Sequence, residues 1–87
     1  MSATDILVVS ETSRDTKAAF VKFKDTFFDC GWVKKMFTHP HPMFILADGS
    51  EVIFIERTKL AKYKPLWKGQ IYPDSMIIQV MRNIWGM

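Results

Sequence analysis

The strongest local pattern of apolar and polar positions lies between residues 43 and 56. Two runs rich in β-branched and aromatic residues, 44–46 and 52–55, flank the dipeptide Asp48-Gly49. An Asp-Gly pair between two such runs is typical of a β-hairpin with a type I′ turn, which needs positive φ angles at both central positions. The pattern therefore predicts two antiparallel strands in the middle of the chain.

Residues 14–30 have the spacing of an amphipathic helix. Thr12, followed by Asp15, approximates the capping pattern that begins a helix, and Gly31 follows the last periodic position as a C′ glycine does. The apolar stripe is made by aromatic residues three or four positions apart: Phe20, Phe23 and Phe27. We predict that this stripe packs in the core rather than binding a ligand.

Three weaker patterns complete the order of elements. The apolar run in residues 5–10 fits a strand buried on both faces or a paired terminal strand, and residues 32–38 fit a further strand. Residues 75–85 fit a last helix, with Asp74 as its cap and Gly86 at its end. The order is (β)-α-β-β-β-α.

This order predicts an α+β two-layer sandwich, in which helices cover one face of a three-stranded antiparallel sheet. At 87 residues the chain is expected to form one domain, spanning 1–87. Residues 1–11 form an extra strand or a loose N-terminus. Residues 57–72 form a basic connecting segment that is functional, helical in part, or mobile, because it is too long for an idle loop.

Composition narrows the class of protein. Apolar residues make up 48% and charged residues 24%, an ordinary globular balance, and no apolar run is long enough to span a membrane. The N-terminal stretch lacks the basic region of a secretory signal, and Cys30, the single cysteine, excludes an internal disulfide. We therefore expect a cytoplasmic protein without a membrane contact. No Cys/His set has zinc spacing, so no metal and no cofactor is expected.

Positive charge is concentrated in the connecting segment. Five of the twelve basic residues lie there, with no acidic residue among them: Arg57, Lys59, Lys62, Lys64 and Lys68. Tyr63 and Trp67 are interleaved with these cations. Lysines neutralise phosphates and aromatic faces stack on unpaired bases, so the segment is a candidate nucleic-acid interface. Two alternatives stay open: the aromatic side chains fold back onto the core, or the lysines bind an acidic protein surface.

A second candidate site is the sequence His39-Pro40-His41-Pro42, just before the hairpin. Proline lacks an N–H and favours extended geometry in the residue before it, so we expect a bulge or connection that presents both imidazoles at a strand end. The alternative is an exposed turn shaped by the prolines, without chemistry.

The middle of the chain resembles the HicA (YcfA-like) toxins. The resemblance is carried by a helix ending in Gly31-Trp32, a strand, a histidine, Phe44 with the hairpin, and residues 73–78, which resemble the P-G-T-L-x-x-I segment of the family. His41 occupies the place of the catalytic histidine in the family's G-S-H-x-x-[FY] segment, although His39-Pro40 stands where the family has Gly-Ser. The resemblance implies a double-stranded-RNA-binding-domain-like fold and metal-independent cleavage of mRNA.

In such a reaction, a neutral His41 would take the proton of a ribose 2′-OH, which then attacks the adjacent phosphate. His39 is the candidate for the complementary acid. Candidates for the cation that stabilises the developing phosphate charge are Lys34, Lys35 and Lys59.

The sequence thus leaves functions of different classes open. The first is a small basic domain that binds RNA or another nucleic acid, with ribonuclease activity at His41 as its extension. The second is a non-enzymatic interaction or inhibitor protein of phage or mobile-element type. It would dock on a host protein or an antitoxin through a sheet edge and the basic-aromatic segment. The third is a subunit that forms a homodimer.

Overall fold

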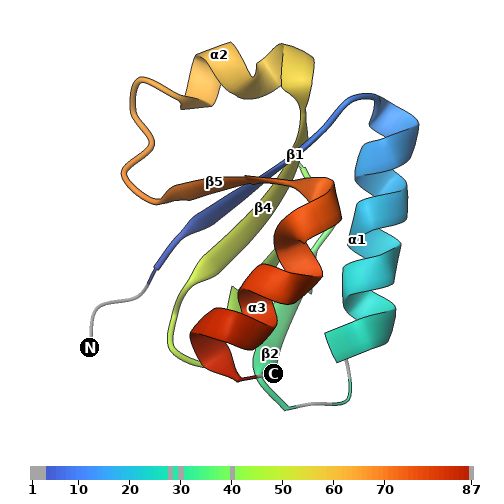
Figure 1. Ribbon diagram of the computed structural model, residues 1–87, viewed down its shortest axis with the longest axis vertical. Helices are drawn as coiled ribbons and strands as arrows, with labels where there is room; N and C mark the ends of the chain where they lie inside the picture. Colours follow the sequence, from blue (N-terminus) through green and yellow to red (C-terminus); the bar gives the residue numbers. More distant parts are fainter. Residues whose placement is uncertain (1–3, 28, 30, 40, 87) are drawn as a thin grey trace.

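A five-stranded mixed sheet forms the centre of this computed structural model, which describes residues 4–27, 29, 31–39 and 41–86 (Figure 1). The sheet order is β2-β3-β4-β1-β5. Strands β2, β3 and β4 pair antiparallel, whereas β1 pairs parallel with both β4 and β5. The strands are β1 Ile6–Ser10, β2 Val33–Phe37, β3 Met43–Leu46, β4 Glu51–Glu56 and β5 Gln70–Pro73. With its three α-helices, the chain belongs to the α+β class, as predicted.

The predicted three-stranded antiparallel sheet is wrong in its extent. The β2-β3-β4 meander is present, but the N-terminal strand β1 lies inside the sheet, and β5, which was expected to be part of a connection, forms one edge. Ile6 is in register with Val52 on one side and with Gln70 on the other. These partners are distant in the sequence, and local periodicity does not reveal such pairings.

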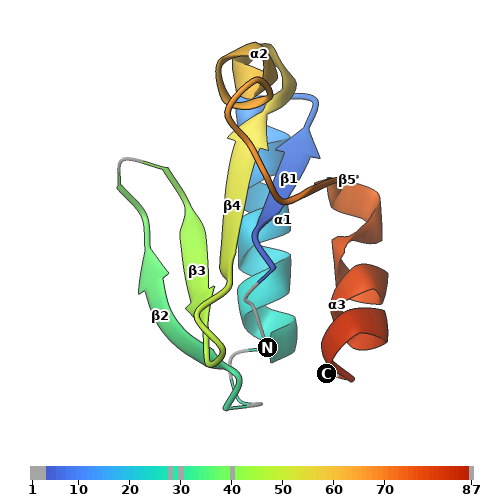
Figure 2. The same ribbon diagram turned by 90° about the vertical axis from the view of Figure 1, so that its left-hand side faces the viewer.

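Helices α1 (Ser13–Phe27) and α3 (Ile77–Trp85) pack on one face of the sheet. The short helix α2 (Leu60–Tyr63) follows the 3-10 turn η2 (Arg57–Lys59) and packs on the opposite face, so the prediction of helices on one face fails for α2. Figure 2 shows β1 and β4 pointing toward the same end of the sheet, where α2 lies. Within the described residues, no helix is long and apolar enough to cross a membrane.

The main core lies between the sheet and the two long helices. The phenylalanine stripe of α1 is buried there, as predicted, and stacks on Phe44 of β3. Phe20 and Phe23 each have their ring centroid 4.7 Å from that of Phe44. From α3, Ile77, Val80 and Met81 join the same cluster.

A smaller core lies on the other face, under α2. It is formed by Leu7, Ile53 and Ile55, and is bordered by half-buried Tyr63 and Trp67. Strands β1 and β4 are therefore covered on both faces. This explains why their sequences are continuous apolar runs rather than alternating ones.

The turn between β3 and β4 differs from the predicted type I′ geometry. Asp48 does not have a positive φ angle, because among the described residues only glycines do, and Gly49 has φ 89°. The Gly49 N–H donates to the Leu46 carbonyl at 3.0 Å, and the Leu46 N–H donates to the Ser50 carbonyl at 2.9 Å. These bonds fit a three-residue loop closed by a left-handed glycine, which also produces an antiparallel hairpin.

The Asp48 carboxylate links this turn to α3. It accepts hydrogen bonds from the Ser50 N–H at 2.9 Å and from the Trp85 indole N–H at 3.0 Å. Partial burial raises the pKa of Asp48, but hydrogen bonds from Ser50 and Trp85 to the charged form outweigh it, so the pKa lies below its ordinary value. The hairpin and the last helix are therefore joined by one charge-assisted contact.

The predicted helix ends are confirmed in part. The Thr12 hydroxyl accepts the Asp15 N–H at 3.1 Å, and Gly31 and Gly86 have the positive φ angles expected beyond helix ends. Helix α1 ends at residue 27, and Cys30 lies outside the described residues. Asp74 does not cap α3, because the 3-10 turn η3 (Asp74–Met76) precedes the helix and no side chain caps either start.

The basic connecting segment is helical in part and then becomes a strand. At the start of β5, the Gln70 N–H donates to the Asp5 carbonyl at 2.8 Å. Gly69 passes so close to the same carbonyl that a Cβ atom there would clash with it. A glycine at this position therefore allows β5 to reach the edge of β1.

Candidate functional site

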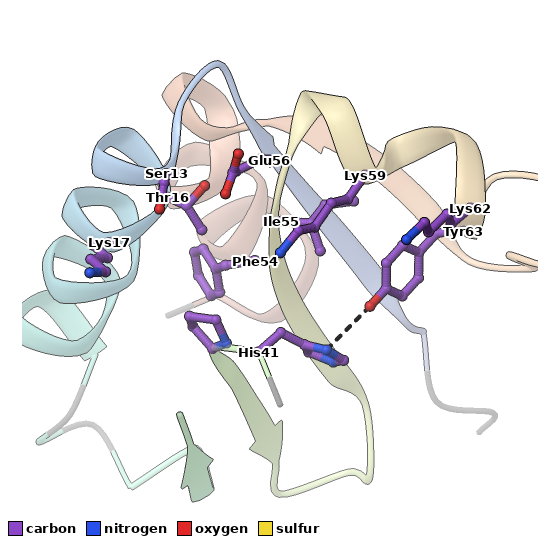
Figure 3. A pocket seen from close by; sticks show the side chains of 11 residues that line it. Ser13, Thr16, Lys17, His41, Phe54, Ile55, Glu56, Lys59, Lys62 and Tyr63 are labelled. Carbon is purple, nitrogen blue, oxygen red and sulfur yellow. Dashed lines mark hydrogen bonds between the residues drawn. The ribbon is translucent and has the colours of Figure 1, made fainter. Parts of the chain in front are cut away.

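An open groove lies at the end of the sheet where β1 and β4 terminate (Figure 3). After β1 the chain enters α1 on one face, and after β4 it enters η2 and α2 on the other. Adjacent parallel strands whose connections leave to opposite faces create a crevice, and ligands of open α/β sheets bind in such crevices. The groove has a volume of about 420 Å³, within the range of small-ligand sites.

His41 reaches this groove because β3 runs antiparallel to β4. The residues just before β3 therefore lie beside the end of β4, and the Phe54 N–H donates to the Pro42 carbonyl at 2.9 Å. Pro42, Phe54 and Ile55 contribute apolar lining. The backbone hydrogen bond of Pro42 thus holds His41 at the edge of the groove, beside its apolar lining.

The walls of the groove come from two helices. The start of α1 contributes Ser13, Thr16 and Lys17, whereas η2 and α2 contribute Lys59, Lys62 and Tyr63. One carboxylate, that of Glu56, lines the groove together with these three lysines. The site is therefore positive overall and suits an anionic ligand.

The imidazole of His41 contacts Tyr63 across the groove. The Tyr63 hydroxyl lies 3.2 Å from His41 Nδ1, and the two rings meet edge to face with centroids 5.9 Å apart (Figure 3). Both side chains are half-buried. These contacts fix the ring orientation of a histidine that comes from a loop.

The direction of this hydrogen bond decides what His41 offers to a ligand. When Tyr63 donates to Nδ1, a neutral His41 carries its proton on Nε2 and presents a donor. When Nδ1 donates to the Tyr63 oxygen, Nε2 has a free lone pair and is able to accept a proton. The first form suits phosphate binding and the second suits general-base catalysis.

The structure brings together four of the site residues predicted from the sequence and separates the others. His41, Lys59, Lys62 and Tyr63 line the groove. Seven predicted residues are not among its lining residues: Lys34, Lys35, His39, Arg57, Lys64, Trp67 and Lys68. Lys34 and Lys35 lie on the edge strand β2, and His39 is exposed. The proposed His39–His41 acid–base pair is therefore not assembled in this groove.

Arg57 and Trp67 have other contacts. The Arg57 guanidinium lies 3.4 Å from the Glu11 carboxylate in an exposed ion pair. Trp67 packs beside the small core, and its indole N–H donates to the Gln70 carbonyl at 3.0 Å. Tyr63 packs beside the same core. Tyr63 and Trp67 thus fold back onto the sheet, which is the alternative that the sequence left open.

Sequence reasoning missed Lys17 and Glu56 as groove residues. In the sequence, Lys17 is one of several lysines on the polar side of a helix pattern, and Glu56 is a single carboxylate at the end of an apolar run. The missing signal was the parallel pairing of β1 with β4, which places the start of α1 beside the end of β4. Among the described residues, no group of three or more His, Cys, Asp and Glu side chains is placed to hold a metal ion.

Comparison of the chain with models of protein families, with curated proteins and with solved structures finds no match. The resemblance to the HicA toxins therefore stays a prediction. So do the expected cytoplasmic location and the homodimer.

Proposed function

We propose that this protein binds a nucleic acid strand through its phosphates, in the groove between the start of α1 and the η2–α2 segment. The observation that supports this best is that three exposed lysines from two helices, Lys17, Lys59 and Lys62, line the same groove as the half-buried imidazole of His41. Lysines that neutralise phosphates release condensed counterions, which drives binding to any nucleic acid sequence. A cytosolic setting belongs to this proposal.

A single strand suits this groove better than a duplex. Of its apolar lining residues, Phe54 and Ile55 are buried in the two cores, and half-buried Pro42 offers a small apolar surface to a sugar or an unpaired base, which a duplex keeps inside its stack. Tyr63 presents its edge to His41 and packs against the sheet, so it contributes a hydroxyl and apolar area rather than a free stacking face.

A comparison of two double variants with the same charge tests the proposal. Lys59→Ala with Lys62→Ala removes two groove cations, and Lys34→Ala with Lys35→Ala removes two exposed cations from the edge strand β2. Fluorescence anisotropy with a labelled single-stranded oligonucleotide should show a loss of about tenfold or more for the first pair and less than about twofold for the second. Equal losses in both variants would contradict a groove-centred site.

Metal-independent cleavage of RNA is a second candidate, favoured by the position of His41 in an open groove with Tyr63 on its Nδ1. It requires the tautomer in which Nε2 accepts a proton, and it predicts RNA degradation in the presence of EDTA. His41→Ala should abolish this degradation, whereas His39→Ala should retain it, because His39 does not line the groove. Cleavage that survives in His41→Ala rules the candidate out.

The structure gives less support to the hypothesis that the protein docks on a partner through the β2 edge. A bulge between Val33 and Lys35 interrupts the pairing of β2, and Lys34 and Lys35 are exposed on it. Bulges and lysines on an edge strand oppose the addition of another strand. A stoichiometric protein partner, together with unchanged oligonucleotide affinity in the groove variants, would favour docking over nucleic-acid binding.

A further inference from the structure

The carboxylate of Glu56 is the one groove feature that phosphate binding does not explain. Glu56 is the last residue of β4 and is half-buried. Figure 3 shows its side chain between Thr16 of α1 and Lys59 of η2. A carboxylate in this position repels phosphate. Its presence in a cationic groove indicates a ligand that also carries a hydrogen-bond donor.

The local contacts leave this carboxylate largely available. Within the described part of the chain, Glu56 accepts one hydrogen bond, from the Thr58 hydroxyl at a long 3.5 Å, and it forms no ion pair. An ionised carboxylate accepts hydrogen bonds at up to about four lone-pair positions. Most of its accepting capacity is therefore not used by described protein donors, and the residue lines the groove.

A nucleic acid strand offers few donors near its phosphates. The ribose 2′-hydroxyl is present on every RNA nucleotide and absent from DNA, whereas amino groups are present only on some bases. A carboxylate that accepts from a ribose hydroxyl is a known solution for nucleotides held at the ends of parallel strands. On such a strand, the lysines would contact the phosphate of a nucleotide and Glu56 would contact its sugar.

We propose that Glu56 accepts a hydrogen bond from a ribose 2′-hydroxyl and thereby makes the groove selective for RNA over DNA. This inference rests on the proposed nucleic-acid binding and narrows its ligand to ribonucleotides. The carboxylate lowers affinity for any strand through repulsion, and RNA alone recovers the loss through a charge-assisted hydrogen bond.

The test uses three labelled single strands of one sequence: RNA, DNA with uracil in place of thymine, and 2′-O-methyl RNA, which cannot donate. The wild-type protein should bind RNA about tenfold more tightly than either of the others, the effect of one hydrogen bond to a charged group. Glu56→Ala should remove this difference and should bind DNA as tightly as the wild type or more tightly.

Glu51→Ala is the matched control. Glu51 lies at the other end of β4 and does not line the groove, so its removal changes the net charge equally and should leave the preference for RNA intact. Retention of DNA binding by Glu56→Ala shows that the variant is folded.

The outcomes distinguish the role of Glu56 from the nucleic-acid binding on which it depends. If all three strands bind the wild type equally, or if Glu56→Ala keeps the preference, the role of Glu56 is overturned while nucleic-acid binding stands. If no strand binds, both proposals fall.

Discussion

Replacement of Phe44 by alanine should cost this protein a large part of its stability. Phe44 is fully buried in β3, its ring stacks with those of Phe20 and Phe23, and it meets Phe54 edge to face with ring centroids 5.9 Å apart. Phenylalanine-to-alanine changes in cores cost about 3–5 kcal/mol. A domain of 87 residues has a free energy of unfolding of roughly 4–13 kcal/mol, so the loss is about a quarter of the total or more.

Phe37 on the neighbouring strand β2 provides the control. It is the same residue type, but 41% of its surface is exposed and it lies at the sheet edge. Phe37→Ala should therefore lower the free energy of unfolding by about 1 kcal/mol or less. Phe44→Leu, which keeps a large apolar side chain in the core, should lose less than about 1.5 kcal/mol.

Urea denaturation followed by tryptophan fluorescence measures these differences. The midpoint should fall furthest in Phe44→Ala and by less in Phe37→Ala and in Phe44→Leu, with the slope of free energy against urea unchanged. A loss in Phe37→Ala as large as that in Phe44→Ala would refute the assignment of the core to the α1 face of the sheet.

Three further variants probe the groove, the hairpin contact and the edge strand. Lys17→Ala should flatten the dependence of log affinity for a single strand on log salt by about 0.7, the effect of one lost phosphate contact; an unchanged slope places Lys17 outside the interface. Trp85→Phe should raise the pKa of Asp48 toward its ordinary value, because the indole hydrogen bond favours the charged carboxylate. The wild-type advantage in thermal melts should therefore be larger near neutral pH and shrink as the pH falls through the lowered pKa, to what the indole gains by packing on the core; an advantage that does not change with pH contradicts this cause. Gly69→Ala should separate β5 from β1 and cost about 1–3 kcal/mol in urea denaturation, and a neutral result would contradict the close approach.

The accuracy of the sequence predictions depended on how local each signal was. The phenylalanine stripe of α1 and the hairpin that contains Gly49 are set by residues close in sequence, and both are present. The turn type was wrong because an Asp-Gly pair suits both a type I′ turn and a loop closed by a left-handed glycine. The choice between them depends on loop length, which the apolar pattern left undefined.

Strand β5 could not be predicted in the same way. It has four residues, ends in Pro73 and shows little burial, so it lacks both the length and the alternation of a recognisable strand. Its partner β1 lies at the other end of the chain, and the pairing is parallel. Such a strand exists because Gly69 permits the approach to Asp5, a contact that no local pattern encodes.

The same non-local pairing explains why only part of the groove was predictable from the sequence. His41 and Lys59 stood out by residue type, as one of two neighbouring histidines and as one of a run of cations. Lys17 and Glu56 have ordinary positions in a helix and at a strand end, and they become groove residues only through the parallel alignment of β1 with β4. The sequence therefore indicated some of the residues that meet in the groove, but not the residues that lie beside them in space.

Topology alone accounts for the convergence of the groove residues. Parallel pairing puts the ends of β1 and β4 at one end of the sheet, so that the start of α1 and the η2–α2 segment face each other across it. Antiparallel pairing of β3 with β4 brings the residue before Pro42, which is His41, to that same end. A groove assembled by three connections has walls that belong to separate elements. Its width is therefore set by the packing of α1 and α2 on opposite faces of the sheet, and its charge is set by side chains that make few contacts with the core. Substitutions of those side chains should consequently change ligand affinity with little change in stability, whereas substitutions in the phenylalanine cluster should do the reverse.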